Sequence, residues 1–323
     1  MIARRCITIP TLIGLTLLAT TIAPLLLIVA WLLARTPGFR GAPHTLGLVL
    51  GYLWCETIGI TRAFLIWLRY RNPAVFLRKN FVLQCWWATT LESLAQRLFG
   101  LSFEVTGAED LAGAPGIMLP RHASIADTLI PMVFYGIPEQ IRLRYVLKRE
   151  LLLDPCLDVV GNRLPNYFVN RDGQDTAAAV TGVQRLAESL EDDEGLLFYP
   201  EGTRFSPERV SALRRRWADN PDLVAQLDRW RYLLPPRLGG TLGLLAANPG
   251  RDLLFCAHAG FEGSSHFSNL VNGAWIGARI HIHFWRVPWA QIPAEVDEQR
   301  EFLFGQWDRM DRWVSLNRRA ENS

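Results

Sequence analysis

The stretch that decides the fold runs from Tyr167 to Tyr199, YFVNRDGQDTAAAVTGVQRLAESLEDDEGLLFY. Its two ends, Tyr167–Val169 and Leu196–Tyr199, are short apolar runs of strand length. Between them, Asp175 can cap a helix from Thr176 to Leu190, in which Ala and Leu gather on one face. A strand, a helix and a second strand in so short a stretch predict a βαβ unit, so we expect the two strands to be parallel neighbours.

Similar runs on both sides extend this unit into an alternating α/β pattern. We expect further strands at Ser102–Thr106, Gly116–Leu119, Arg144–Leu147, Leu253–Ala257 and Ile280–Val287, and a terminal helix from Glu295 to Leu316.

The N-terminal region differs, because it is apolar. No charged residue occurs from Cys6 to Ala34, a run longer than the roughly 20 residues that cross a bilayer core. A cleaved signal peptide has a shorter apolar run and an Ala-x-Ala-like site, so we expect a retained anchor. A second run, Thr45–Leu68, contains Glu56 and Arg62. A second membrane span, a re-entrant segment and an interfacial helix are all compatible with it.

The stretch from Ala74 to Leu98 is amphipathic at helical spacing, with Trp86 and Trp87 near basic residues. A helix at the lipid interface and a helix packed on the domain core both fit this pattern. We therefore expect three regions: a membrane anchor at 1–70, an interfacial helix at 71–100 and an α/β domain at 101–323.

Composition and charge exclude several classes of protein. Half of the residues are hydrophobic and a fifth are charged, which excludes a disordered chain. A net charge of +3 is too small for a dedicated nucleic-acid binder. Residues 1–70 hold six arginines and one acid, so the basic excess lies beside the apolar runs, where it can meet anionic lipid head groups. Five cysteines without CxxC or zinc spacing favour a reduced, cytosol-facing domain.

Polar residues with catalytic chemistry follow the predicted strand at 116–119. His122 and Asp127 are five residues apart, which on an ideal helix is about 140° around the axis. They can meet if His122 lies in the loop before a helix and Asp127 lies in its first turns. Asp127 would then accept the Nδ1 proton and leave Nε2 free as a base for a hydroxyl group. A surface histidine near a helix-capping aspartate is the structural alternative.

Two more loops place an arginine just past a predicted strand. Asn170-Arg171-Asp172-Gly173 follows one strand, and Pro200-Glu201-Gly202-Thr203-Arg204 follows another. Ligands bind at this edge of open α/β sheets, and guanidinium groups pair with phosphate in a bidentate manner. A base with two phosphate-type donors suggests a substrate that carries both a hydroxyl and a phosphate.

Together these residues resemble the glycerolipid acyltransferase family, the 1-acylglycerol-3-phosphate acyltransferases and their relatives. The motifs that carry the resemblance are His122-x4-Asp127, Phe168-x2-Arg171 and Pro200-Glu201-Gly202-Thr203-Arg204. The segment Leu234–Gly240, LPPRLGG, is similar to one in the larger membrane-anchored branch, which includes lysocardiolipin and lysophosphatidylinositol acyltransferase-like proteins. The resemblance implies a glycerol-3-phosphate acyltransferase-like mixed sheet flanked by helices, preceded by a membrane-anchoring helical region.

The resemblance also implies a role for each residue. His122 would be the general base and Asp127 would orient it, whereas Arg171, Glu201, Gly202, Thr203 and Arg204 would form the acceptor and phosphate site. The hydroxyl of lysophosphatidic acid or a related lysophospholipid would attack the thioester of acyl-CoA or acyl-carrier protein directly. Ser124 would then not be the nucleophile. No metal or cofactor is implied. The enzyme would lie in a membrane, the cytoplasmic membrane if the chain is bacterial, with its catalytic domain facing the cytosol.

Some residues depart from the family pattern. Arg121 stands where the family often has Asn, Ala126 replaces a frequently bulky residue, and Gly161 lies far ahead of Phe168. These differences bear on the acceptor more than on the reaction. A lysophospholipid hydrolase, an acyltransferase for another lipid-linked hydroxyl or amine, and a non-catalytic lipid-binding protein are the alternatives. The chain has no G-x-S-x-G motif, which argues against the hydrolase.

Three other histidines were considered for the site. His258, after the predicted strand at 253–257, is interpreted as a packed histidine rather than a second base. His281 and His283 share one face of a predicted strand, and without a nearby third ligand they do not predict a metal site.

Overall fold

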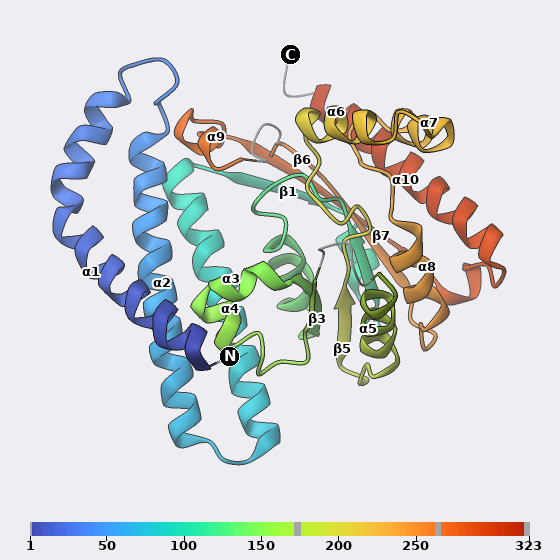
Figure 1. The fold of residues 1–323 in the computed structure, drawn as a ribbon, viewed down its shortest axis with the longest axis horizontal. Helices are drawn as coiled ribbons and strands as arrows, with labels where there is room; N and C mark the ends of the chain where they lie inside the picture. Colours follow the sequence, from blue (N-terminus) through green and yellow to red (C-terminus); the bar gives the residue numbers. More distant parts are fainter. Residues whose placement is uncertain (1, 171–175, 262–265, 320–323) are drawn as a thin grey trace.

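The structure, a computed structural model of the chain, describes residues 2–170, 176–261 and 266–319. Within these residues one seven-stranded sheet has the order β1-β7-β6-β2-β5-β3-β4 (Figure 1). The strands are β1 (Ser102–Thr106), β2 (Ile117–Pro120), β3 (Arg142–Lys148), β4 (Tyr167–Val169), β5 (Glu194–Leu197), β6 (Leu253–Ala259) and β7 (Arg279–Val287). All neighbouring pairs are parallel except β6 and β7. The predicted mixed sheet is therefore confirmed.

All seven predicted strands are present, but one prediction about their order is wrong. β4 and β5 are parallel, yet they are not neighbours, because β3 lies between them and pairs with both. β3 pairs with the two strands along different halves of its length, Arg142–Tyr145 with β5 and Val146–Lys148 with β4. β4 has only three residues and takes the edge of the sheet. The predicted helix cap, Asp175, lies outside the described residues.

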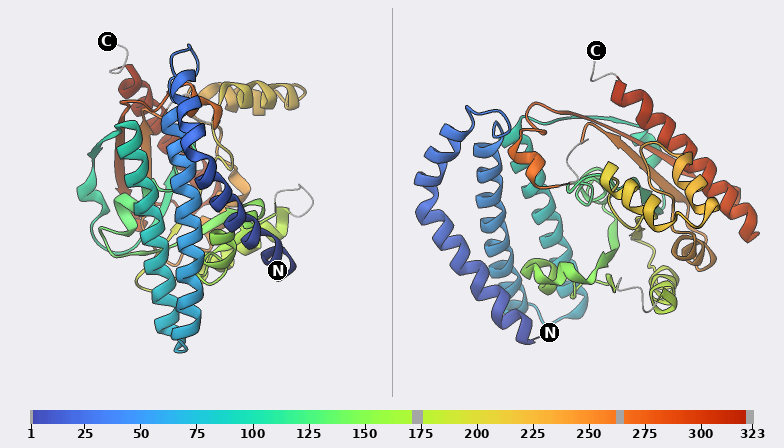
Figure 2. Two further views of the ribbon diagram at one scale, coloured as in Figure 1. Left: turned by 90° about the vertical axis from the view of Figure 1, so that its left-hand side faces the viewer. Right: turned by 45° about the horizontal axis from the view of Figure 1, so that its top comes forward.

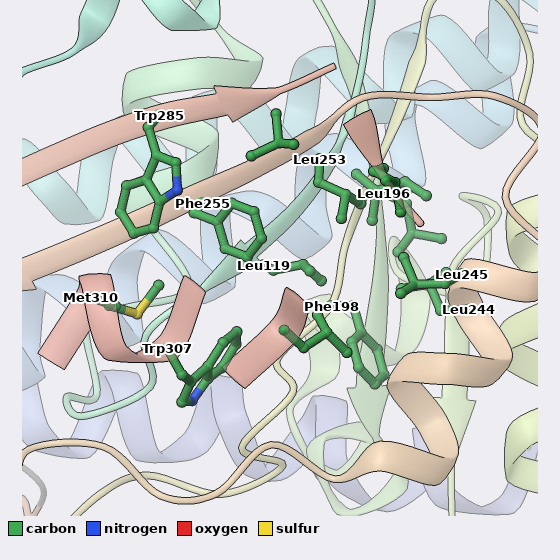
Figure 3. Packing of buried hydrophobic residues seen from close by; sticks show 14 of the residues in the cluster. Leu119, Leu196, Phe198, Leu244, Leu245, Leu253, Phe255, Trp285, Trp307 and Met310 are labelled. Atoms are coloured by element: carbon green, nitrogen blue, oxygen red, sulfur yellow. The ribbon is translucent and has the colours of Figure 1, made fainter. Parts of the chain in front are cut away.

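Helices cover both faces of the sheet. On one face lie α5 (Thr176–Glu188), α8 (Leu238–Ala246) and α10 (Val296–Arg319), which form a core with alternate strand residues such as Leu253 and Phe255 (Figures 1 and 3). The other face holds α3 (Pro73–Phe99) and a π-helical turn at Met132–Gly136, packed against Leu254, Cys256 and their neighbours. Successive side chains of a strand point to opposite faces, so β6 contributes to both cores.

The remaining elements are short or lie at the rim. They are α4 (Pro155–Val159), α6 (Pro207–Arg216), α7 (Pro221–Arg229), α9 (Ser268–Val271) and the 3₁₀ turns Ala108–Leu111, Arg149–Leu153 and Trp289–Gln291. Sequence analysis did not foresee α6 and α7, which lie beside α10 at one end of the molecule (Figure 1).

Three long helices form the N-terminal part of the structure. α1 (Ile2–Leu33) and α2 (Ala42–Arg69) lie side by side, and α2 packs on α3 (Figures 1 and 2). Both α1 and α2 are long and apolar enough to cross a membrane. Many of their large apolar side chains are exposed, Leu25, Trp31 and Phe64 among them. The buried face of α3 packs on the sheet. The placement of α3 at a lipid interface and the division of the chain into three regions remain predictions.

The two charges inside the second apolar run have partners. Glu56 is fully buried and accepts hydrogen bonds from Trp87 Nε1 at 2.6 Å and from the Cys156 backbone N–H at 3.1 Å. The guanidinium of Arg62 stacks on Trp86, 4.0 Å from the ring centre. Glu56 thus joins α2 to α3 and to α4 of the α/β domain. A buried charge with such partners is compatible with an apolar helix.

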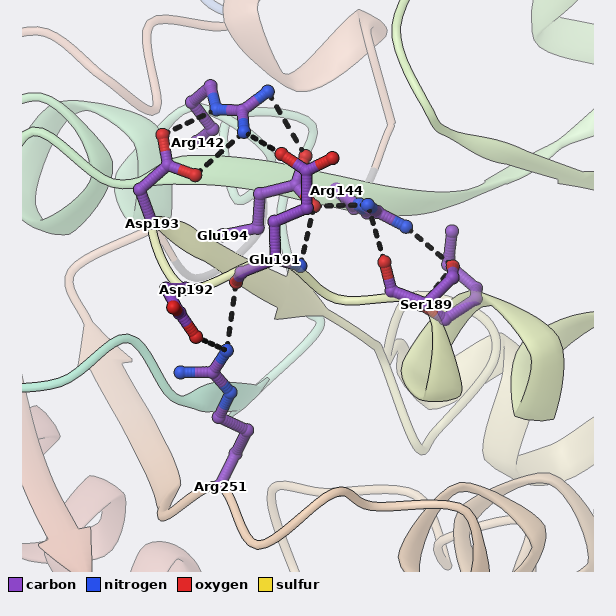
Figure 4. Close-up of polar contacts among 9 residues, drawn as sticks. Arg142, Arg144, Ser189, Glu191, Asp192, Asp193, Glu194 and Arg251 are labelled. Atoms are coloured by element: carbon purple, nitrogen blue, oxygen red, sulfur yellow. Dashed lines mark hydrogen bonds and ion pairs between the residues drawn. The ribbon is translucent and has the colours of Figure 1, made fainter.

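A buried ion-pair cluster lies where β3 and β5 begin, at the opposite end of these strands from the loops that follow them (Figure 4). Arg144 is 6% exposed and pairs with Glu194, which is 1% exposed. Arg142 joins the cluster, with its guanidinium 3.3 Å from Glu194 and 2.7 Å from Asp193. The pair fixes the register of β3 against β5.

The substitution Glu194→Ala should lower the free energy of unfolding by about 3–5 kcal/mol, because it leaves the Arg144 guanidinium buried without its carboxylate. Thermal and denaturant unfolding of the purified protein measure this change. The control Asp228→Ala breaks the exposed Arg214–Asp228 pair and should have no measurable effect. Equal stability of the Glu194→Ala variant and the unchanged protein would contradict the assignment.

Candidate active site

The loop that carries His122 begins where β2 ends. The Arg121 N–H donates to the Cys256 carbonyl at 2.9 Å, which extends the β2–β6 ladder by one residue. The loop after β5 meets it there, since the Phe205 N–H donates to the His122 carbonyl at 2.7 Å. The two predicted loops therefore come together at the carboxyl ends of β2, β5 and β6, the edge at which α/β sheets bind ligands.

His122 and Asp127 form the predicted pair. His122 Nδ1 lies 3.0 Å from Asp127 Oδ2. The same oxygen accepts the backbone N–H groups of Ala123 at 2.5 Å and Ser124 at 2.8 Å. His122 thus lies in the loop and Asp127 in the turns that follow, as the spacing required. With Asp127 as acceptor, Nδ1 carries the proton and Nε2 keeps its lone pair.

Burial and charge set the protonation of this pair. Burial lowers the pKa of His122 below its ordinary 6.5, and the positive charges of Arg204 and Lys148 lower it further against the opposing effect of Asp127. Burial raises the pKa of Asp127, but its two histidine neighbours, His258 and His122, outweigh burial and hold the pKa well below its usual value. At neutral pH, Asp127 is therefore ionised and His122 is a neutral base.

Glu201 acts on this loop through the backbone. Its Oε1 accepts the His122 N–H at 2.7 Å, and its Oε2 accepts the Leu234 N–H at 2.8 Å. Burial raises the pKa of Glu201 to about 8 against these two hydrogen bonds. The side chain joins the His122 loop to the segment at Leu234 rather than facing the adjacent cavity.

The glycine after Glu201 is required by its backbone and its neighbour. Gly202 has φ of +69°, and a Cβ there would lie 2.6 Å from Nε of Arg237. Any larger residue would be strained and would displace that guanidinium. Thr203 is half-buried between Gly202 and Arg204.

A cavity of about 300 Å³ begins at His122, and we call it the His122 cavity. Lys148 and Arg204 line it close to His122, and we call this part its polar end. The rest is largely apolar, lined by residues of α3, the loop after Asp127 and the region around α4, including Leu83, Ala88, Leu129, Met132, Leu157, Val160 and Leu164. One apolar cavity with two cations beside a histidine base suits a substrate with an acyl chain and an anionic group.

A second apolar cavity of about 310 Å³ lies between α2, α3 and the loop after Asp127. It shares Trp87, Ile125, Thr128 and Leu129 with the His122 cavity and is lined by Ala95 of α3. His122 and the two cations do not line it within the described part of the chain.

The structure places the other predicted residues as follows. Arg204 lines the His122 cavity, whereas Arg171 lies outside the described residues. Ser124 is buried, and its Oγ accepts the Ala126 N–H at 3.2 Å.

Across the residues that the structure describes, no group of three or more metal-ligating side chains occurs. His281 pairs with Glu104, and His283 stacks on Trp285 and Trp313.

Four further residues adjoin the site, although the sequence motifs assigned none of them to it. Lys148 ends β3 in the cavity, and Tyr199 donates from its hydroxyl to the Asp127 carbonyl at 2.9 Å. Arg121 is 1% exposed and donates to the carbonyls of Tyr232 and His258. His258 lies beside Asp127. The position of Lys148 at the end of a strand is the signal that points to it, and Arg204 was identified from the same kind of position.

Comparisons with known proteins bear on the family and on the fold. Residues 102–236 match the family model described as Acyltransferase. The fold is similar to the crystal structure of the 1-acyl-sn-glycerophosphate (LPA) acyltransferase PlsC from Thermotoga maritima, with 13% identity and a TM-score of 0.54. The similarity covers 85% of this chain and 96% of that one. A search of curated protein sequences gave no match. The resemblance inferred from the motifs is thus confirmed over residues 102–236, and the structural likeness confirms the fold.

The electrostatics of the site predict how His122 titrates. In a ¹⁵N NMR titration of the imidazole, the pKa should lie below 6.5. The substitution Arg204→Gln should raise it, because a nearby positive charge that disfavours the imidazolium is removed. Arg214→Gln, on the surface of α6, is the control and should change nothing. A pKa of 6.5 or higher in the unchanged protein would refute the assigned environment.

Proposed function

We propose that this enzyme, whose residues 102–236 form an acyltransferase domain, moves a fatty acyl chain from an acyl thioester to the free hydroxyl of lysophosphatidic acid or a related lysophospholipid. The donor is acyl-CoA or acyl-carrier protein, and no further cofactor takes part. The observation that carries the proposal is the position of the His122–Asp127 pair at the mouth of an apolar cavity, with Lys148 and Arg204 beside it.

In the proposed reaction, His122 Nε2 removes the proton from the acceptor hydroxyl. The hydroxyl oxygen attacks the thioester carbonyl carbon, and the resulting tetrahedral oxyanion collapses as the carbon–sulfur bond breaks. The proton on His122 then passes to the departing sulfur, which leaves as a thiol. Asp127 stabilises the imidazolium between these two transfers. No acyl-enzyme forms in this scheme, although Ser124 also lines the cavity, so the scheme is tested at both residues.

Charge and cavity shape support the assignment of the two substrates. Lys148 and Arg204 give the polar end two positive charges for the acceptor phosphate, and Arg171 is proposed to add a third. The apolar remainder of the His122 cavity suits the acyl chain of the donor. Such a chain gains about 0.8 kcal/mol for each buried methylene.

The N-terminal helices support a membrane location. At 1.5 Å per residue, α1 and α2 are each longer than the roughly 30 Å hydrocarbon core of a bilayer. We propose that residues 1–70 anchor the enzyme as a helical hairpin, that α3 lies at the interface, and that residues 101–323 face the cytosol. This arrangement brings the cavity to the lipids on which it acts.

The substitution His122→Ala should lower the rate of acyl transfer by about 10²–10⁴-fold, the contribution expected of a general base. Ser124→Ala should keep most of the activity. The assay follows the diacyl product by mass from an acyl-CoA and lysophosphatidic acid. Undiminished transfer by His122→Ala, or trapping of an acyl group on Ser124, would refute direct attack and favour hydrolase-type chemistry.

The cavity predicts a change in chain-length preference. Ala88 is 3% exposed and lines the His122 cavity from α3, so Ala88→Phe should shift the preferred acyl-CoA to shorter chains. Ala95→Phe is the matched control, because Ala95 lies on the same helix but lines the second cavity. The measurement is kcat/KM across a series of saturated acyl-CoAs. A shift with Ala95→Phe and none with Ala88→Phe would contradict the assigned chain site.

A further inference from the structure

His258 lies near the end of β6 and is 1% exposed. Sequence analysis interpreted it as a packed histidine, and its burial agrees with that. Its side chain shares a sheet face with those of Cys256 and Leu254, two and four residues earlier, which is the face of the His122 loop. A buried imidazole on this face can act on the catalytic pair.

The two oxygens of Asp127 have different partners. Oδ2 takes His122 Nδ1 and two backbone N–H groups. Oδ1 is buried and has no well-aligned hydrogen bond among residues 2–170, 176–261 and 266–319. His258 Nε2 faces it at 3.2 Å as an ion-pair partner. Because a buried carboxylate oxygen without a donor is costly, this contact is the one that compensates Oδ1.

The position of His258 is fixed by its surroundings. β6 lies between β2 and β7, with His258 opposite Ile282. Arg121 Nη1 donates to the His258 carbonyl at 2.6 Å, and His258 Nε2–H donates to the Arg121 carbonyl at 3.4 Å. His258 Nδ1 is buried without a hydrogen-bond partner in the described structure. A proton on Nε2 alone leaves only an acceptor unpaired, so the neutral Nε2–H tautomer suits the site best.

We propose that His258 is a positioning residue of the catalytic pair, whose Nε2–H lies between the Arg121 carbonyl and Oδ1 of Asp127 and thereby holds the carboxylate in place for His122. The proposal deepens the proposed function, since it rests on His122 as the base. In it, Asp127 lies between two imidazoles, one that exchanges a proton with substrate and one that does not. The Nε2–H of His258 offsets part of the negative charge of Asp127. The carboxylate therefore stabilises a protonated His122 less, which keeps the pKa of His122 lower.

Other charged and titratable groups also face the pair. Those around His122 are Asp127, Tyr199, Arg204 and Lys148, with Glu201 on its backbone N–H. Those around Asp127 are His122, His258, Tyr199, Cys256 and Glu201. Changes at His258 leave the cations Arg204 and Lys148 in place, so their effect on His122 passes through Asp127 and through the backbone at Arg121.

Three variants test the role of His258. His258→Leu removes the donor, and it should raise the pKa of His122 by about one unit, which is tenfold in the protonation equilibrium. His258→Gln should return the pKa of His122 to its value in the unchanged protein, because the amide nitrogen of glutamine reaches the position of Nε2. His258→Asn should not, since its amide nitrogen reaches only the position of Nδ1. His283→Gln, a histidine on the neighbouring strand stacked between tryptophans, is the control.

The primary readout is the ¹⁵N NMR titration of the His122 imidazole in the full chain, which needs no substrate. The second readout is the acid limb of the plot of kcat/KM against pH. In His258→Leu this limb should shift to higher pH, and kcat should fall about tenfold. An unchanged His122 titration in His258→Leu would overturn the proposal, as would equal restoration by Asn and Gln. If the leucine variant does not fold, the Gln and Asn pair decides alone. An unchanged protein without acyl transfer would refute the proposed function, and the titration would still decide the role of His258.

Discussion

The carboxylate of Asp127 is the group on which the candidate site depends. One oxygen takes the His122 imidazole and two backbone N–H groups, so the same charge that orients the base also folds the loop around it. On a regular helix the two side chains would lie about 140° apart and could not meet. The turn is therefore a requirement of the chemistry. The free-energy cost of ordering this turn is offset by charge-assisted hydrogen bonds, which are among the strongest in proteins.

The sheet supplies the rigid frame for this loop. The loop begins at the end of β2, beside the end of β6. Glu201, which follows β5, joins the loop to the segment at Leu234 through two hydrogen bonds. Helix α3 then closes the apolar cavity that begins at His122, while α2 is tied to α3 and α4 through Glu56. The apolar N-terminal helices and the polar site are thus parts of one structure, suited to a substrate with an acyl chain and a charged head group.

The sequence predicted all seven strands and the meeting of His122 with Asp127, because strand periodicity and a five-residue spacing are local signals. It predicted the wrong neighbour for β4, since nothing in the βαβ unit shows that β3 will lie between its strands. His258 was recognised as buried, but its contact with Asp127 depends on the pairing of β6 with β2, which only the folded chain reveals. Lys148 differs, because its position at the end of a strand is a local feature of the sequence.

The central claim is acyl transfer to a phosphate-bearing lipid by direct attack on a thioester. The most direct measurement is to incubate the purified full chain with one acyl-CoA and a panel of lysophospholipids, and to identify every product by mass. The proposed function predicts a diacyl phospholipid and free CoA in equal amounts. Release of free fatty acid in place of the diacyl product, or no product from any acceptor, would contradict it.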